Sequence, residues 1–202
     1  MDIQLWREIL EPYELAVDEL VVKFNHLITA NRKAGNYSPI EQVHGRVKTI
    51  SSILEKSQRK KIEMSEIENR IEDIAGIRVI CQFVEDIDRV IEIIEKRNDM
   101  KVIQKKDYIT NPKANGYRSL HLIVEIPIYL YNEKRYMRVE VQLRTIAMES
   151  WANLEHKLRY KKELSPAQLE NTEHLLNECA QICAELDHKM QTIRDIIDEN
   201  DD

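Results

Sequence analysis

Two acidic side chains, Asp73 and Glu140, are the residues of this chain best suited to chemistry on phosphates. Asp73 comes just before a predicted strand and Glu140 lies inside another, so the two carboxylates can meet if those elements are neighbours. Mg²⁺ usually takes one or two carboxylates from a protein and completes its shell with water and substrate phosphates. Such a pair predicts phosphoryl-type transfer, in which positioning and charge neutralisation supply the catalysis.

Cationic side chains cluster in two blocks, although the formal net charge of the chain is −6. Residues 46–61 hold six basic residues and one acidic residue, and residues 101–118 hold five and one. Lysine and arginine are the donors expected in a phosphate site. The acidic balance disfavours a general nucleic-acid binder, so we expect no DNA partner. A pair of solvated faces is the alternative interpretation of the two blocks.

The glycines exclude several kinds of nucleotide site. There are four, Gly35, Gly45, Gly76 and Gly116, and no two lie close together in the chain. Walker A loops, dinucleotide-binding fingerprints and kinase glycine loops all need clustered glycines to bring backbone N–H groups against phosphate. Any phosphate site in this protein must therefore be built from side chains.

The composition indicates a soluble protein of the cytoplasm. Hydrophobic residues make up 43% and charged residues 33% of 202 residues, which fits one globular domain of residues 1–202. No apolar run approaches the ~20 residues that cross a bilayer, so we expect no membrane association. Three cysteines without a CxxC pair predict neither a disulfide framework nor a zinc site.

Helices are predicted before and after a central group of strands. A long helix over residues 3–34 has Pro12 inside it, which predicts a kink or a later start, and residues 35–45 read as a connection. A second helix over residues 48–61 would carry a cationic ridge formed by Lys48, Ser52, Lys56 and Arg59. A capping box from Ser65 to Glu68 would start a third helix that ends at Gly76. Asp86 or Asp88 could cap a further helix. Another follows the last strand, and Ser165 caps a final helix over residues 166–198. Its apolar stripe could pack on the first helix or on another subunit.

The strands are predicted at residues 77–83, 100–109, 118–126 and 136–144, where apolar and polar residues alternate. Together with the helices they predict an α+β fold: a small mixed sheet of four or five strands flanked by helices. Alternation gives the sheet one covered face and one wetter face. The residues expected on the wetter face are Arg78, His121, Glu140, Gln142 and Arg144, and a merely solvated face is the competing interpretation.

Three long runs resemble the synthetase domain of the RelA/SpoT homologue family, across about residues 44–161. They are DIAGIRVICQF (73–83), KDYITNPKANGYRSLHLIVE (106–125) and VEVQLRTIAMESWANLEHKLRYK (139–161). The chain is most similar to the small stand-alone alarmone synthetases of that family. The resemblance implies a nucleotidyltransferase-like catalytic core at residues 44–161, between end helices at residues 3–34 and 166–198.

The activity implied by this resemblance is a GTP pyrophosphokinase that uses Mg²⁺. Such an enzyme moves the pyrophosphoryl group of ATP to the ribose 3′-hydroxyl of GDP or GTP and releases AMP. GMP is a further candidate acceptor. By the same resemblance Asp73 and Glu140 hold the metal, and Glu140 activates the hydroxyl. The residues implied at the ATP site are Arg46 and Arg78 around adenine, and Lys48, Ser52, Lys56 and Arg59 along the triphosphate. Those implied at the acceptor site are Tyr117 stacked on guanine, His121, Lys113, Asn115, Gln142 and Glu155.

The resemblance has further implications and some departures. An Arg-x-Lys-Asp stretch of the long bifunctional members is replaced by QKKD at residues 104–107, and no His-Asp hydrolase domain is present, which predicts synthesis without degradation. A tetramer formed through the end helices and an allosteric alarmone ligand are also implied. Two other functions stay open: the same transfer onto the 3′ end of tRNA, and a non-catalytic regulator that binds guanine nucleotides or RNA.

Overall fold

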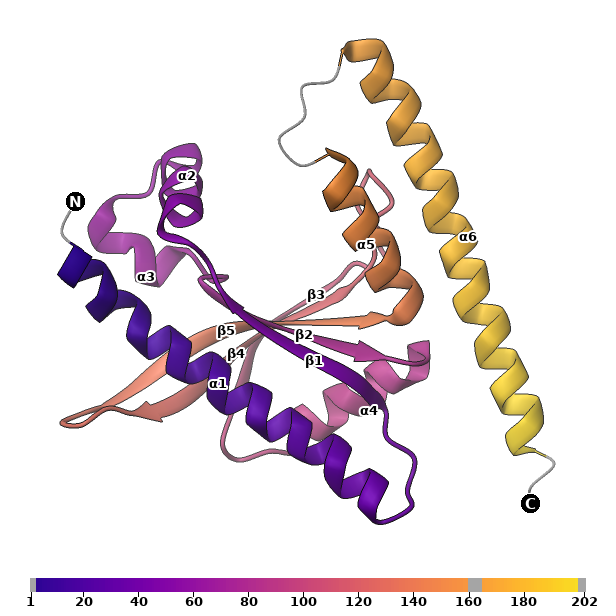
Figure 1. Cartoon of the computed structure of the whole chain (residues 1–202), viewed down its shortest axis with the longest axis horizontal. Coiled ribbons are helices and arrows are strands. Elements are labelled where there is room, and N and C mark those ends of the chain that lie inside the picture. The colour runs from indigo at the N-terminus through magenta and orange to yellow at the C-terminus, as the bar shows by residue number, and fades with distance from the viewer. Residues whose placement is uncertain (1–2, 160–164, 200–202) are drawn as a thin grey trace.

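Five strands form one mixed sheet in the order β1-β2-β5-β4-β3 (Figure 1). The computed structural model describes residues 3–159 and 165–199. The strands are β1 (Ile40–Val47), β2 (Ala75–Cys81), β3 (Lys101–Asp107), β4 (Leu120–Tyr129) and β5 (Lys134–Thr145). The central pair, β2 and β5, is parallel, and the other neighbours are antiparallel. The predicted small mixed sheet is thus confirmed.

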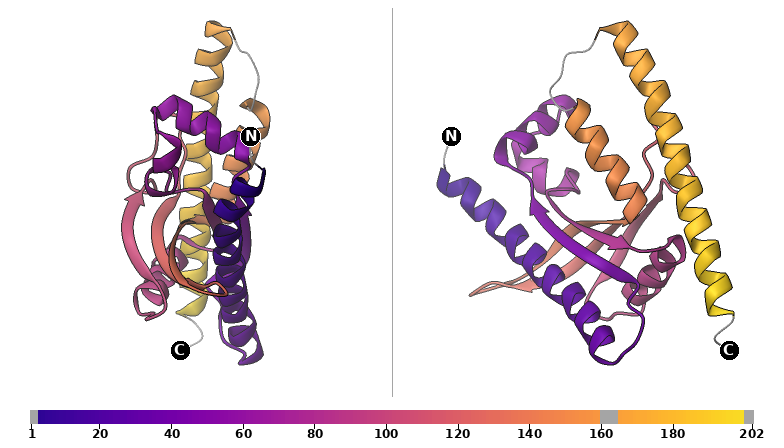
Figure 2. Two further views of the ribbon diagram at one scale, coloured as in Figure 1. Left: turned by 90° about the vertical axis from the view of Figure 1, so that its left-hand side faces the viewer. Right: turned by 45° about the vertical axis from the view of Figure 1, so that its right-hand side comes forward.

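Six α-helices surround the sheet. They are α1 (Ile3–Lys33), α2 (Ile50–Lys60), α3 (Ile67–Arg70), α4 (Val84–Glu95), α5 (Ile146–Arg159) and α6 (Pro166–Asp198). Apolar residues of α1 and α4 join those of the sheet in one core, and both helices contact the central strands β2 and β5. Figure 1 shows α2 and α3 at one end of the sheet and α5 and α6 at the other, and Figure 2 shows α6 running along the outside of the molecule. A pocket lined by Arg46, Arg78 and Gln142 opens over β1, β2 and β5, on the polar face of the sheet.

The first helix confirms its predicted apolar stripe. Trp6, Tyr13, Leu20 and Phe24 are all at most 4% exposed, and they pack on the sheet. The helix begins at Ile3 and continues through Pro12, so the later start considered from the sequence is wrong.

Residues 40–47 form a strand, which corrects the prediction of a connection over residues 35–45. This strand, β1, is the edge of the sheet and pairs antiparallel with β2. Its alternation is weak because only Ile40 is fully buried among its side chains, and an edge strand needs fewer apolar residues. Gly45 faces α1, where a Cβ would lie only 2.4 Å from Val17 Cγ1, so only glycine leaves room for the helix.

The short segment before β2 also differs from the prediction. Helix α3 ends at Arg70, and no side chain caps its start, so the predicted capping box from Ser65 to Glu68 does not form. Asp73 lies in the turn that follows, and Gly76 lies inside β2 rather than at a helix end. Asp86 accepts a hydrogen bond from the N–H of Phe83 at 3.1 Å from within the first turn of α4, which begins at Val84.

The last helix packs against α5 and α4 rather than against α1. Its cap is the predicted one, because Ser165 Oγ accepts from the N–H of Gln168 at 3.3 Å. Most of its apolar stripe is exposed: Leu175, Ile182, Leu186, Met190, Ile193 and Ile197. No helix within the described residues is both long and apolar enough to cross a membrane.

Candidate active site

The register of the three central strands places polar side chains in one row across the sheet. Arg78 on β2 is opposite Gln142 on β5, and Gln142 is opposite His121 on β4. Opposite residues in a ladder point to the same face. Two positions earlier on β5, Glu140 stands opposite Gly76, which has no side chain to cover it. The row and Glu140 therefore share the open face of the sheet.

Glu140 is held by hydrogen bonds to both of its carboxylate oxygens. His121 Nδ1 lies 3.0 Å from Oε1, and Gln142 Nε2 donates to Oε2 at 2.6 Å. The side chain is only 14% exposed. Burial raises the pKa of Glu140, but His121, Gln142 and the charge of Lys56 outweigh it and lower this pKa to about 2. Glu140 is therefore an ionised carboxylate and a weak base.

Both contacts of Glu140 lead back to one guanidinium. Arg144 Nη2 donates to the Tyr117 hydroxyl at 2.6 Å and to Gln142 Oε1 at 2.9 Å. The Tyr117 hydroxyl also lies 2.8 Å from His121 Nε2, where either group can be the donor. Because an ionised carboxylate only accepts, His121 donates from Nδ1 to Glu140. Two chains of hydrogen bonds thus run from Arg144 to the two oxygens of Glu140.

The second carboxylate, Asp73, is held by two lysines. Lys56 Nζ lies 2.7 Å from Oδ1, and Lys48 Nζ lies 3.3 Å from Oδ2. Burial raises the pKa of Asp73, but the hydrogen bond from Lys56 and the charge of Lys48 lower it more, with a net decrease. The charge of Glu140 acts in the opposite direction and raises the pKa of Asp73. The two carboxylates are therefore close enough to repel each other, and the Lys56 charge stabilises both.

This donor set suits a divalent cation that arrives with phosphates. Two mutually repelling carboxylates balanced by a lysine ammonium form a place where positive charge is favourable. The described residues contain no group of three or more histidine, cysteine or acidic side chains arranged around a metal. Asp73 and Glu140 would supply the one or two protein ligands that Mg²⁺ takes beside substrate oxygens.

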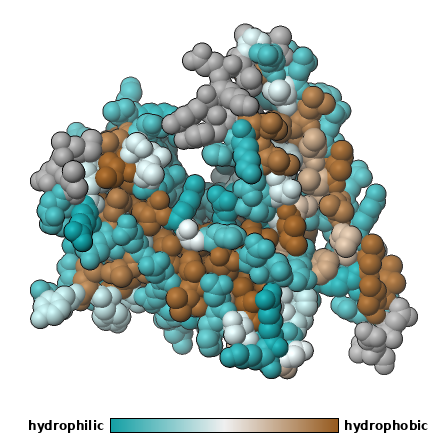
Figure 3. Space-filling model, viewed as in Figure 1, coloured by the Kyte–Doolittle hydropathy of each residue, from teal (hydrophilic) through white to brown (hydrophobic). Residues whose placement is uncertain are grey.

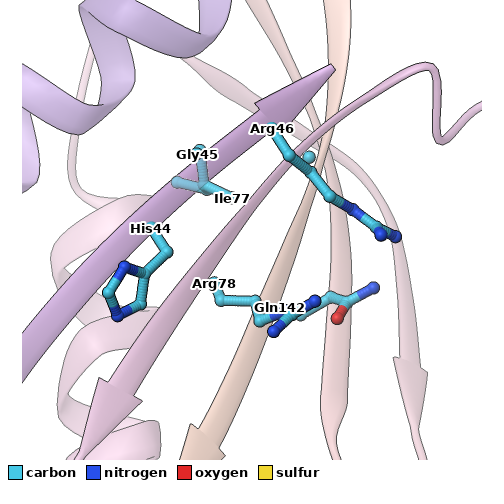
Figure 4. Close-up of a pocket in the computed structure, with 7 residues that line it drawn as sticks. His44, Gly45, Arg46, Ile77, Arg78 and Gln142 are labelled. Atoms are coloured by element: carbon cyan, nitrogen blue, oxygen red, sulfur yellow. The ribbon is translucent and has the colours of Figure 1, made fainter. Parts of the chain in front are cut away.

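A cavity of about 130 Å³ lies over β1, β2 and β5 (Figure 4), and Gly76, which stands opposite Glu140, is among the residues that line it. It is lined by both arginines predicted for adenine, Arg46 and Arg78, and by Gln142. These three side chains extend to the same side of the sheet in Figure 4. Arg78 is oriented by α5, where it donates to Glu149 Oε1 at 2.9 Å and to Asn153 Oδ1 at 3.4 Å. Arg46 is exposed at the mouth of the cavity.

The loop before β4 presents an aromatic group on the other side of Glu140. Tyr117 packs edge-on against Trp151, with ring centroids 6.5 Å apart. Lys113 Nζ lies 4.7 Å from the centroid of the Tyr117 ring, and burial lowers the pKa of this lysine. Asn115 Oδ1 accepts from the N–H of Tyr117 at 3.2 Å, and Asn115 Nδ2 lies 3.5 Å from Glu155 Oε1. The loop thus brings together Lys113, Asn115, Tyr117 and Glu155.

The cationic ridge is only partly as predicted. Helix α2 begins at Ile50 with Thr49 as its cap, so Lys48 precedes the helix instead of lying on it. Ser52 contacts the cap, where Thr49 Oγ1 donates to its hydroxyl at 3.0 Å. Arg59 is exposed further along α2 and makes neither of the ion pairs that hold Asp73.

Sequence reasoning missed the residues that support the site from behind. Arg144 was placed on the polar face without a role, and Glu149 was not considered. Arg144 shares the two-residue period of Glu140 and Gln142, and Glu149 is spaced four residues from Asn153 on a helix. These patterns could have indicated a shared face, but not the contact between the two residues.

Known proteins resemble this chain along nearly its full length. Residues 45–165 match the family described as a region found in RelA/SpoT proteins. The GTP pyrophosphokinase YwaC of Bacillus subtilis is 42% identical over 96% of this chain and 92% of its own length. Small alarmone synthetase 1 of B. subtilis bound to its product pppGpp has a TM-score of 0.90 and 41% identity, over 96% of this chain and 99% of that one. The same protein bound to AMPCPP has a TM-score of 0.83 and 37% identity, over 97% and 99%. On this evidence, the chain belongs to the RelA/SpoT family.

Proposed function

We propose that this protein is a GTP pyrophosphokinase that synthesises ppGpp and pppGpp. The β,γ-pyrophosphoryl group of ATP moves to the 3′-hydroxyl of GDP or GTP, and AMP is released. The observation that carries the proposal is the position of Glu140 between an arginine-lined cavity and an aromatic loop, in a chain 42% identical to a GTP pyrophosphokinase. A relative solved with pppGpp and with AMPCPP supports nucleotides as ligands of this protein.

The cavity over β1, β2 and β5 is the proposed adenine site. Arg46 and Arg78 line it, and guanidinium groups stack well on aromatic rings. The triphosphate would then run along the start of α2, where Lys48, Ser52 and Lys56 lie, with Arg59 one turn further. Side chains supply all of this positive charge, which agrees with the lack of a glycine-rich phosphate loop.

The loop before β4 is the proposed acceptor site. The Tyr117 ring offers a face for guanine, which Lys113 covers in this structure and would leave when a base binds. Lys113 would then be free to contact the acceptor phosphates. Asn115, Gln142 and Glu155 supply polar groups around the same nucleotide, and His121 borders its ribose.

Glu140 is the proposed partner of the attacking hydroxyl. The 3′-oxygen bonds to the β-phosphorus, the bond from this phosphorus to the α,β-bridging oxygen breaks, and the electron pair leaves with AMP. A carboxylate with a pKa of about 2 accepts a hydrogen bond from the hydroxyl and takes its proton only as the new bond forms. Such a weak base suffices for a loose transition state, which needs little nucleophilic assistance. When bound at Asp73 and Glu140, Mg²⁺ would neutralise the charge on the transferred phosphates.

Further properties complete the proposal. We place the catalytic core within residues 44–161, of which 160–161 lie outside the described residues, and we place the protein in the cytoplasm. The exposed apolar residues of α6, which form part of the hydrophobic surface in Figure 3, suit a homotetramer formed through the end helices. An alarmone is the proposed allosteric ligand of that assembly.

Product analysis tests the reaction. Purified protein with ATP, GDP and Mg²⁺ should release AMP and form ppGpp, and Glu140→Gln should lower the rate by roughly 10²–10⁴. Chelation with EDTA should stop the reaction until Mg²⁺ is restored. Adding bulk tRNA to the same assay tests the alternative acceptor, which the named relatives do not favour. If tRNA were the acceptor, radiolabel from ATP would appear in it. Nucleotide binding without AMP release would refute the proposed enzymatic activity.

A further inference from the structure

Glu149 on α5 bridges two arginines of the site, Arg78 and Arg144. Its Oε1 accepts from Arg78 Nη1 at 2.9 Å, and its Oε2 accepts from Arg144 Nη1 at 2.6 Å. Glu149 is 15% exposed and Arg144 6%, so solvent screens these contacts little. The charge and hydrogen bonds of the two arginines lower the pKa of Glu149 despite its burial. One carboxylate therefore sets the position of both guanidinium groups.

Each arginine leads to a different subsite. Arg78 lines the cavity over β1, β2 and β5. Arg144 donates to the Tyr117 hydroxyl at 2.6 Å and is the origin of the two hydrogen-bond chains that reach Glu140. Without the carboxylate, two like charges would face each other in a largely buried place, and both would reorient. The contacts of Glu149 lie on the α5 side of both arginines, so they can orient both subsites.

We propose that Glu149 is a positioning residue that couples the ATP subsite to the acceptor subsite through Arg78 and Arg144. The inference rests on the proposed function, since that function assigns the two subsites to ATP and to GDP or GTP. Glu149 itself lies behind the two guanidinium groups. Its effect on ATP passes through Arg78, and its effect on the acceptor passes through Arg144, which contacts both Tyr117 and Gln142.

Binding measurements on Glu149→Gln test this role. Glutamine keeps the size of the side chain and one acceptor oxygen but removes the charge. We expect the Kd values of AMPCPP and of GDP, measured by calorimetry with Mg²⁺, each to rise roughly tenfold. The matched control is Asp99→Asn, which removes a half-buried carboxylate paired with Arg97 at 2.6 Å and Lys23 at 2.9 Å outside the site. Neither Kd should change in the control.

Double-mutant cycles separate positioning from a general structural role. In an Arg78→Ala background, Glu149→Gln should still weaken the binding of GDP but no longer affect the binding of AMPCPP. In a Tyr117→Phe background, it should weaken AMPCPP binding as before but weaken GDP binding less, because only the contact of Arg144 with Gln142 remains. Equal losses for both ligands in every background, or unchanged Kd values, would overturn the inference. If the glutamine variant does not fold, Glu149→Asp replaces it, because the shorter side chain cannot keep both contacts at their present lengths. AMP release by the wild type is measured separately. Its absence would refute the proposed enzymatic activity, whereas the binding measurements test the positioning role of Glu149.

Discussion

Replacing Gly45 with alanine tests how closely the first helix confines the strand that carries Arg46. A Cβ at this position would lie 2.4 Å from Val17 Cγ1 and 2.8 Å from Val21 Cγ2. Carbon atoms in contact normally lie about 3.5–4.0 Å apart. The strand or the helix would therefore have to move by about 1 Å, and both are part of the packed core.

The expected loss of stability follows from two opposing effects. Forcing one extra methyl group into a packed core costs about 1–3 kcal/mol. Alanine also restricts the unfolded chain and returns about 0.4–1 kcal/mol, because the backbone of Gly45 needs no left-handed conformation. We expect the free energy of unfolding to fall by about 1–2 kcal/mol. The affinity for AMPCPP should fall as well, because Arg46 is the next residue on the displaced strand.

Urea unfolding measures the change, and Gly76→Ala is its matched control. Gly76 lies on the neighbouring strand, where an added Cβ meets only the backbone oxygen of Glu140, at the ordinary distance of 3.5 Å. This control should cost little or stabilise slightly. Val17→Ala removes the nearer obstacle, so Gly45→Ala should cost less in that background. If the two alanine variants proved equally stable, the close approach of α1 to β1 would be refuted.

Two further predictions concern the carboxylates. The pKa of Glu140 is about 2 in the folded protein against an ordinary 4.5, so the stability that its charge contributes is complete above about pH 5 and is lost as the pH falls toward 2. Between pH 6 and pH 3, the wild type should lose about 2 kcal/mol relative to Glu140→Gln in urea unfolding, and a constant difference would contradict the low pKa. Lys56→Met leaves Asp73 with Lys48 alone, so the pKa of Asp73 should rise and the rate of AMP release should fall at least roughly tenfold. Carbon NMR titration of Asp73 checks the first part, and an unshifted carboxyl would count against this ion pair.

Strong local patterns led to correct predictions of most elements. The stripe of α1 and the alternation in β4 and β5 appear at nearly the expected residues, because each has one buried face with a regular period. β1 was missed because an edge strand with a glycine and several polar residues lacks that signal. The capping box at Ser65 matched a motif, but the segment there is only a 3₁₀ turn (Met64–Glu66) and four residues of helix.

In the candidate site, too, residues with a local sequence signal were predicted and residues that depend on distant contacts were not. Residue types and spacing pointed to Asp73, Glu140 and the lysines of residues 46–61, and the similarity to a family assigned their roles. The support by Arg144 and Glu149 could not be predicted, because Glu149 meets Arg78 from 71 residues away.

By itself the sequence determined the polar face, the cations that replace a glycine loop, and the family. Those properties are written in local period, in composition and in continuous motifs. Only the tertiary structure decided which strands pair, that Lys48 and Lys56 converge on Asp73, and that Glu149 joins two arginines. Hydrogen bonds and ion pairs act over a few ångströms in space, and distance along the chain carries no record of them.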